Sequence, residues 1–191
     1  TQGYFKTSLE DKPLITVITV VFNGEKFLEE TIQSVISQTY ENVEYIIIDG
    51  GSTDGTIDII KKYEERLDYW ISESDDGIYD AMNKGISLCS GDIIGLINAD
   101  DWYEIETILI IANKFTTNSG AILHGSMNLI KGNKFYYTAK PVPNLSSLKK
   151  GMIINHPTVF VPSSLYKKYG FFSTDYKIAS DWDLMLKFYC R

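Results

Sequence analysis

The sequence has 191 residues, a mass of 21.7 kDa and 44% hydrophobic residues, which fits one soluble globular domain and excludes a disordered chain. Its net charge of −7 divides unevenly: residues 1–110 carry 7 Lys/Arg and 22 Asp/Glu, whereas residues 111–191 carry 11 and 3. The acidic first half argues against nucleic-acid binding, because carboxylates repel phosphates. No apolar run reaches the roughly 20 residues of a membrane span, and residues 1–4 lack a signal-peptide pattern.

Strands and helices alternate through the first 97 residues. An apolar run at residues 15–22 predicts a strand buried on both faces, and the spacing of Leu28, Ile32 and Val35 predicts a helix after it. Further strands are expected at residues 43–48, 69–72 and 93–97, with helices at about 53–66 and 78–89. This alternation implies right-handed βαβ units, and therefore an α/β fold with a mainly parallel, Rossmann-like sheet and helices on both faces.

The pattern changes in the remaining part of the chain. We expect a helix at about 104–115, a strand at 121–127, a hairpin at 129–137 turning at Gly132 and Asn133, a loop at 142–150, a strand at 158–161 and a helix at 181–189. The last helix has an apolar face. We expect a further C-terminal segment to cover this face and to complete a binding site. The domain should span residues 13–191, after an extension of residues 1–12.

Two adjacent carboxylates, Asp100 and Asp101, directly follow the apolar strand at residues 93–97. Adjacent like charges cost free energy unless a cation lies near them, and hard divalent cations prefer carboxylate oxygens. The alternative is that an aspartate here caps the next helix. The acid pair is therefore a candidate metal site.

A glycine-rich turn at residues 49–55 follows the second strand. It lacks the spacing of a dinucleotide fingerprint and of a P-loop, although its glycines would let a ligand approach the backbone closely. Asp49 ends the strand, and its carboxylate either accepts a hydrogen bond from a base or sugar or stabilises the turn.

Two further candidates lie in the acid-poor second half. Asp181 could act as a general base, or cap the last helix. His156 could bind a metal ion or a phosphate, or be a structural histidine. Cys89 and Cys190 are far apart, which predicts a reducing compartment and no disulfide framework.

Taken together, these patterns resemble the family 2 glycosyltransferases, inverting enzymes of the GT-A fold that build bacterial polysaccharides. The matching segments are residues 15–23, 38–40, 49–56 (D-G-G-S-T-D-G-T), 77–85 (G-I-Y-D-A-M-N-K-G), 91–101, 156–157 and 179–184. Two positions depart from the common pattern: Met82 stands where many members carry arginine, and Ser180 where glutamate is frequent.

The resemblance implies that residues 1–110 bind a nucleotide-sugar, expected to be a UDP-sugar, and that residues 111–191 bind the acceptor. Phe22 would stack on the base and Asp49 would accept from its ring N–H. The implied donor-binding residues are Val20, Phe22, Asn23, Asp49, Ser52, Asp76, Lys84 and Asp100. The implied metal ligands for Mn²⁺ or Mg²⁺ are Asp100 and Asp101, with His156 as a further candidate, and the implied catalytic base is Asp181.

The expected reaction is an inverting transfer of a hexose to a glycan or a polyprenyl-diphosphate-linked glycan in cell-surface polysaccharide synthesis. The alternatives are a nucleotidyltransferase, whose basic glycine-rich phosphate loop is not found after the first strand, and a non-catalytic nucleotide- or glycan-binding module. We expect a cytoplasmic protein in peripheral contact with the inner face of the membrane. The residues expected to face this membrane surface are Lys131, Lys134, Lys140, Lys149 and Lys150. The alternative is that these lysines face solvent.

Overall fold

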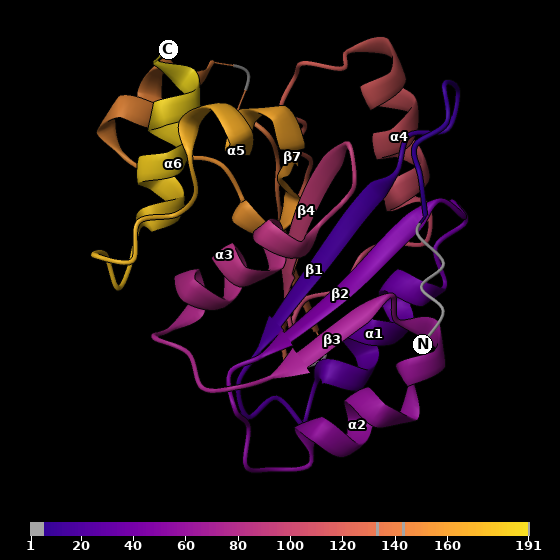
Figure 1. Ribbon diagram of the computed structural model, residues 1–191. Helices are drawn as coiled ribbons and strands as arrows, with labels where there is room; N and C mark the ends of the chain where they lie inside the picture. Colours follow the sequence, from indigo (N-terminus) through magenta and orange to yellow (C-terminus); the bar gives the residue numbers. More distant parts are fainter. Residues whose placement is uncertain (1–5, 133, 143, 191) are drawn as a thin grey trace.

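The computed structural model describes residues 6–132, 134–142 and 144–190, and its centre is a five-stranded sheet (Figure 1). The strand order is β3-β2-β1-β4-β7. Its members are β1 (Ile15–Val21), β2 (Val43–Asp49), β3 (Tyr69–Ser72), β4 (Ile93–Asn98) and β7 (Phe160–Pro162). The first four run parallel, as predicted, and only the short edge strand β7 is antiparallel to its neighbour β4.

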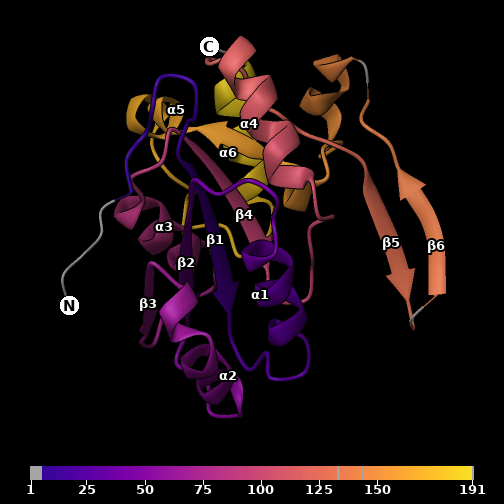
Figure 2. The same ribbon diagram turned by 90° about the vertical axis from the view of Figure 1, so that its right-hand side faces the viewer.

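Helices cover both faces of this sheet (Figures 1 and 2). One face packs against α1 (Leu28–Ile36), α2 (Thr56–Lys62) and α4 (Thr107–Thr117). The other packs against α3 (Ile78–Leu88), α5 (Ser163–Tyr169) and α6 (Ser180–Tyr189). Three short 3₁₀ helices complete the connections: η1 (Glu64–Arg66), η2 (Leu145–Lys150) and η3 (His156–Thr158).

The sequence of β1 shows why two cores form. Successive side chains of a strand point to opposite faces, so Ile15 and Val17 enter the core under α1 and α4 while Ile18 and Val20 enter the core under α3. Every residue of β1 is buried. This is why the run is apolar throughout rather than alternating.

The order of the strands determines where a ligand can enter. The chain leaves β1 toward β2 and β3 on one side, and α3 then carries it back to β4 on the other side of β1. In open α/β sheets a crevice forms at the carboxyl ends of the two strands where the order reverses. Here those ends are Val21 and Asn98.

A separate two-stranded hairpin, β5 (Met127–Lys131) and β6 (Lys134–Ala139), stands away from the body of the domain (Figure 2). The expected hairpin is confirmed, with strands longer than predicted; of its two predicted turn residues, Asn133 lies outside the described residues. No helix in the described part of the chain is long and apolar enough to cross a bilayer.

Several expected elements differ. The strand predicted at residues 121–127 is wrong, because in residues 121–126 only Leu123 has a strand partner, Phe160, and Met127 belongs to β5. The segment predicted as a loop at 142–150 contains η2, whose first turn is capped by the Asn144 side chain accepting from the Ser146 N–H at 2.8 Å. The helix expected from residue 53 starts at Thr56, since Asp54 accepts from the Thr56 N–H at 3.0 Å and holds a turn before it. The short helix α5 was not predicted.

Candidate functional site

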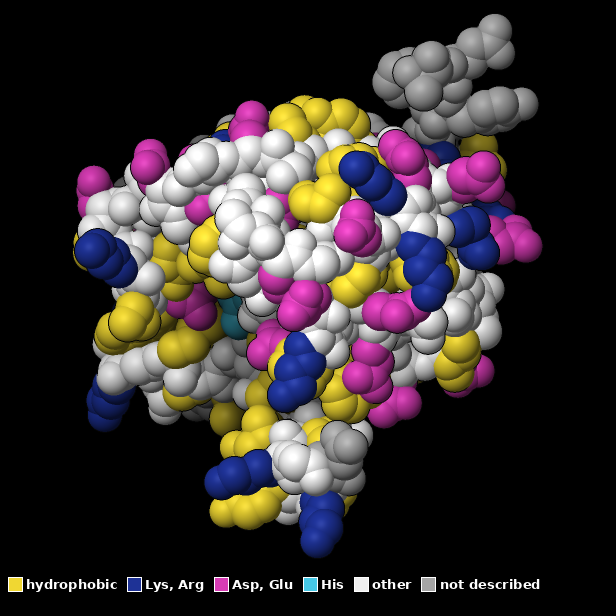
Figure 3. Space-filling model, turned by 90° about the horizontal axis from the view of Figure 1, so that it is seen from below, with side chains coloured by type: hydrophobic (Ala, Val, Ile, Leu, Met, Phe, Trp, Pro, Cys, Tyr) yellow, Lys and Arg dark blue, Asp and Glu magenta, His cyan; other side chains and the backbone are white. Residues whose placement is uncertain are grey.

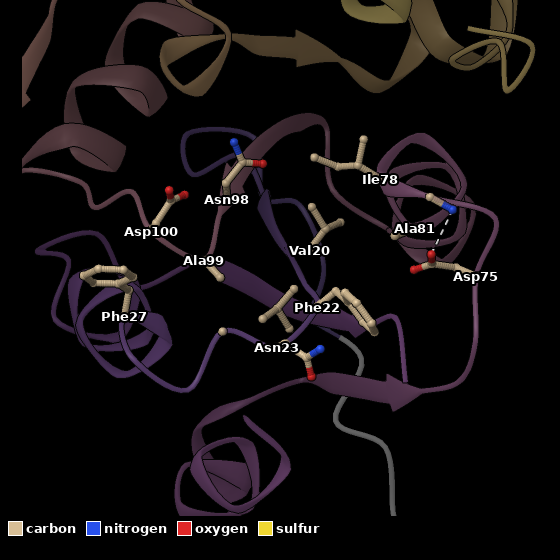
Figure 4. A pocket seen from close by; sticks show the side chains of 13 residues that line it. Val20, Phe22, Asn23, Phe27, Asp75, Ile78, Ala81, Asn98, Ala99 and Asp100 are labelled. Carbon is tan, nitrogen blue, oxygen red and sulfur yellow. Dashed lines mark hydrogen bonds between the residues drawn. The ribbon is translucent and has the colours of Figure 1, made fainter. Parts of the chain in front are cut away.

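A cavity of about 520 Å³ opens at the crevice between β1 and β4 (Figure 4). Its walls come from the ends of these strands and from the start of α3. The lining residues are Val20, Val21, Phe22, Asn23, Gly24, Phe27, Asp75, Gly77, Ile78, Ala81, Asn98, Ala99 and Asp100. Four of the residues predicted to bind a donor, Val20, Phe22, Asn23 and Asp100, are therefore brought together.

Phe22 is the more exposed of the two phenylalanines that line the cavity, Phe22 and Phe27. Its side chain is 65% exposed although β1, which it follows, is fully buried. An aromatic ring left in water at the mouth of a cavity offers a flat apolar face on which a planar base can stack.

The glycine-rich block at residues 49–56 holds the segment that follows β1. The Asn23 N–H donates to the Ser52 hydroxyl at 2.7 Å, and the Asn23 side-chain oxygen accepts from the Thr53 N–H at 2.9 Å. The Gly24 N–H donates to the Thr56 hydroxyl at 2.8 Å. Asn23 itself has a φ of 52°, an unusual backbone conformation that these contacts maintain.

Asp49 lies beneath this block and is completely buried. Its carboxylate accepts from the N–H groups of Gly51 and Ser52, both at 3.0 Å, from the Ser72 hydroxyl at 2.6 Å, and from the Ser52 hydroxyl. Gly51 has a φ of 83°, which favours glycine there. This geometry fits the turn-stabilising alternative. Neither Asp49 nor Ser52 lines the cavity, and a direct contact of either with a nucleotide stays a prediction.

Asp75, rather than the predicted Asp76, lines the cavity. The Asp75 carboxylate accepts from the Gly77 N–H at 2.9 Å (Figure 4), whereas Asp76 is exposed and its N–H donates to the Asp80 carboxylate at 3.2 Å. Gly77 has a φ of 113°, so the chain turns sharply there. An aspartate two residues before a turn glycine is the signal that would have identified Asp75.

Lys84 does not line the cavity. Its ammonium lies 3.1 Å from the Glu73 carboxylate and 3.3 Å from that of Asp80, and it donates to the Ser74 carbonyl at 3.4 Å. These contacts hold the loop before α3. Met82, which stands where many members of the resembled family carry arginine, is buried in the core. In the described residues α3 therefore presents no unpaired cation to the cavity.

The acid pair follows β4. Asp100 is exposed and lines the cavity, while Asp101 is partly buried. Burial and the neighbouring charge of Asp100 raise the pKa of Asp101 to about 6. The helix-cap alternative is wrong, because α4 begins only at Thr107, six residues after Asp101, and no side chain caps it.

The loop carrying the acid pair is held by α1 and by the segment after it. The Thr31 hydroxyl donates to the Asp101 carbonyl at 2.7 Å. The Gln38 side chain donates to the Glu104 carbonyl at 2.8 Å and accepts from the Ile108 N–H at 2.9 Å. The matching segment at residues 38–40 therefore acts by fixing this loop.

The oxygen atoms near the acid pair suit a divalent cation. The Asn98 side-chain oxygen is buried without a partner among the described residues and belongs to the cavity wall. The described residues contain no cluster of three or more His, Cys, Asp or Glu side chains able to hold a metal ion alone. Mg²⁺, however, is commonly bound by one or two carboxylates together with substrate phosphates. Asp100 and Asp101 fit that arrangement.

Asp181 lies in the first turn of α6, on the α3 side of the sheet. Helix α6 starts after Ala179, which has a φ of 74° and no side-chain cap, so Asp181 is not the cap. The Tyr79 hydroxyl donates to the Asp181 carboxylate at 3.3 Å, across 102 residues of sequence. The adjacent Ser180 hydroxyl is buried without a partner in the described residues.

His156 belongs with Asp181 and Tyr79 rather than with the acid pair. Its ring lies 6.1 Å from that of Phe172, and burial lowers the pKa of His156, which the charge of Asp181 partly opposes. The imidazole is therefore neutral at pH 7. It does not join Asp100 and Asp101 in a metal cluster within the described residues, and its role as a ligand stays a prediction.

A second, larger hollow of about 860 Å³ begins at the acid pair and runs between α4 and β5. Most of its lining is apolar, and it includes Trp102, Ile110, Leu129 and Ile130. We call it the α4–β5 groove.

Comparison with known proteins identifies the family. Residues 16–179 match the model of Glycosyl transferase family 2. The chain belongs to this family. An uncharacterised glycosyltransferase of Rickettsia typhi is 33% identical over 189 residues, covering 92% of this chain and 58% of that protein. One of Mycobacterium tuberculosis is 32% identical over 179 residues, covering 92% and 68%.

Solved structures agree on the fold. Residues 1–349 of Staphylococcus aureus TarS superpose with a TM-score of 0.76 at 23% identity, covering 91% of this chain and 54% of that one. The mannosyltransferase PcManGT of Pyrobaculum calidifontis, in complex with GDP-Man and Mn²⁺, gives 0.67 at 21% identity, covering 92% and 52%. The fold is thus the GT-A fold. The chain spans only part of the length of these proteins.

Proposed function

We propose that this glycosyltransferase binds a UDP-linked sugar in the cavity between β1 and β4 and transfers the sugar, with inversion, to a glycan or a polyprenyl-diphosphate-linked glycan. The observation that carries the proposal is the meeting of exposed Phe22 and Asp100 in one cavity at the carboxyl ends of the sheet. TarS has been solved with UDP and with UDP-GlcNAc, which supports a nucleotide-sugar donor.

Different residues of the cavity bind different parts of the donor in this proposal. Phe22 stacks on the base, and Val20 and Asn23 frame it. Asp75 and Asp100 lie where they can accept hydrogen bonds from ribose hydroxyls, because both carboxylates line the same cavity. The described cavity wall contains no lysine or arginine to neutralise a diphosphate.

That lack of a cation is the physical reason to expect Mn²⁺ or Mg²⁺. Asp100 and Asp101 would hold the ion, and the unpartnered Asn98 oxygen lies beside them in the chain. When bound, the ion supplies Lewis-acid stabilisation of the leaving diphosphate. PcManGT carries Mn²⁺ together with GDP-Man, which supports this expectation.

Asp181 serves as the base in this proposal. Its carboxylate takes the proton from the acceptor hydroxyl as that oxygen bonds to the anomeric carbon, while the bond from that carbon to the diphosphate breaks on the opposite side. General-base assistance of this kind contributes about 10²- to 10⁴-fold in rate. The Tyr79 hydroxyl, donating at 3.3 Å, orients the carboxylate.

The α4–β5 groove is the acceptor side of the proposed site. It shares Asp100 and Asp101 with the donor side, and Trp102 within it is 44% exposed. An exposed indole face suits the apolar face of a sugar ring, and the long apolar lining suits a lipid tail. A role in cell-surface glycan synthesis is consistent with a 28% identical relative of Mycobacterium bovis, a PGL/p-HBAD biosynthesis glycosyltransferase.

Calorimetry with UDP in the presence of Mn²⁺ tests the donor site. Loss of base stacking costs about 1–3 kcal/mol, so Phe22→Ala should weaken UDP binding by about 5- to 150-fold. Phe171→Ala is the matched control, because Phe171 is also exposed and lies outside the cavity lining. Equal affinity of wild type and Phe22→Ala would refute the site, and tight binding without turnover of any acceptor would favour a binding module.

A further inference from the structure

The chain contains a long segment without any carboxylate side chain. Between Glu106 and Asp175 the sequence has no Asp or Glu, and this segment carries eight lysines. The first part of the domain is strongly acidic, so the basic character is concentrated in one region rather than spread over the surface. The β5–β6 hairpin lies inside this segment.

At the tip of the hairpin, residues of the same kind stand opposite each other across the two strands. Lys131 stands directly opposite Lys134 in the register, and Ile130 stands directly opposite Phe135. Like charges placed opposite each other in a ladder destabilise it, because their side chains lie close together. In the described part of the chain neither lysine forms a salt bridge. An anionic partner outside the chain would relieve this repulsion.

Apolar side chains surround these two lysines. Phe135 is 63% exposed and Tyr136 is 67% exposed, at positions of the strand where polar side chains would be expected to face water. The hairpin projects from the body (Figure 2), and a projecting lobe at the lower edge of Figure 3 shows lysine side chains among hydrophobic ones. Aromatic rings and lysines together on a protruding tip match the interface of a membrane, where rings lie at the headgroup level and lysines contact anionic lipids.

We propose that the tip of the β5–β6 hairpin, formed by Ile130, Lys131, Lys134, Phe135 and Tyr136, docks the protein on an anionic lipid surface. Lys149 and Lys150 are not part of this tip, because they lie in η2, which follows the far end of β6. A nucleic acid or another anionic polymer would contact the two lysines. It would make no use of Ile130, because an aliphatic side chain does not stack on a base.

The direction of the hairpin connects this surface with the site. The tip points toward the same end of the molecule as the carboxyl ends of β1 and β2 (Figure 2), and Ile130 lines the α4–β5 groove that begins at the acid pair. If the acceptor is lipid-linked, which rests on the function proposed above, docking through the tip presents that groove to the membrane.

Co-sedimentation of the 191-residue chain with vesicles tests the docking, without any donor sugar present. Vesicles of phosphatidylglycerol and phosphatidylcholine in equal parts should bind the protein, and vesicles of phosphatidylcholine alone should bind it far less. Each lysine near an anionic surface contributes about fivefold, so Lys131→Gln with Lys134→Gln should weaken partitioning by about 30-fold. The matched control is Lys149→Gln with Lys150→Gln, which changes the charge equally and should leave partitioning nearly unchanged.

Phe135→Ser tests the apolar part and should weaken partitioning several-fold with all lysines kept, because apolar burial adds to charge attraction. All replaced side chains are exposed, so thermal unfolding should match the wild type. The proposal fails if anionic vesicles do not bind the protein, if both lysine pairs matter equally, or if Phe135→Ser has no effect. It also fails if polyphosphate binds the tip and vesicles do not. Loss of sugar transfer with intact vesicle binding would refute only the proposed function.

Discussion

Asp101→Asn should make the metal-free protein more stable at neutral pH. Asp101 is partly buried beside the charge of Asp100, and these two causes raise the pKa of Asp101 from 3.8 to about 6. Ionising the side chain in the folded state therefore costs more than ionising it in the unfolded chain. The asparagine keeps the shape and removes the charge.

The magnitude follows from that difference. Each unit of pKa corresponds to about 1.4 kcal/mol, which sets an upper bound of about 3 kcal/mol, and solvent screening of a partly buried group reduces this to about 1–2 kcal/mol. The sign follows from proton binding. Between pH 4 and 6 the folded protein holds a proton on Asp101 that the unfolded chain has lost, so this group lowers stability as pH rises through that window. Above pH 6 the full cost applies.

Urea unfolding in EDTA measures this effect. The free energy of unfolding of Asp101→Asn should exceed that of the wild type by about 1–2 kcal/mol at pH 7.5, and the gain should shrink toward zero near pH 4. Asp100→Asn is the matched control: Asp100 is exposed, so its replacement removes only the repulsion and should give a smaller gain. A gain that does not change with pH, or no gain at pH 7.5, would refute the reasoning.

Two further variants test the core and the proposed base. Gly95→Ala should lower the free energy of unfolding by about 1–3 kcal/mol in urea, because a Cβ there would collide with the ring of Phe160; an unchanged midpoint would contradict this packing. Tyr79→Phe should slow sugar transfer about tenfold with an unchanged Kd for UDP, because it removes one hydrogen bond to the Asp181 carboxylate. Tyr63→Phe, which removes a hydroxyl that donates to Glu29 away from the site, should leave the rate unchanged.

Strands β1 and β4 of the central sheet could be predicted because they are continuous apolar runs, the pattern expected of a strand buried on both faces. Helix α5 left no such trace. It has only seven residues, and of these only Tyr166 is buried. The opposite error occurred at residues 121–127, where an apolar segment was predicted as a strand but only Leu123 pairs before β5 begins at Met127.

Some residues of the candidate site could be predicted from the sequence and others could not. Phe22 and Asp100 could be predicted because each directly follows a strand end, and parallel strands bring their carboxyl ends to one edge. The role of Asp49 could not be settled from the sequence, because a strand-end carboxylate suits a ligand and a turn equally well; four hydrogen bonds within the fold favour the turn. The contact between Tyr79 and Asp181 joins residues 102 apart and depends on how α3 and α6 pack.

The release of nucleoside diphosphate from UDP-sugars, measured with Mn²⁺ in wild type and in Asp181→Asn, tests the central claim most directly. The wild type should release UDP with an acceptor present, and Asp181→Asn should lose transfer by about 10²-fold or more while binding UDP with unchanged affinity. Normal transfer by Asp181→Asn, or a variant that fails only because it no longer binds UDP, would contradict the assignment of Asp181 as the base.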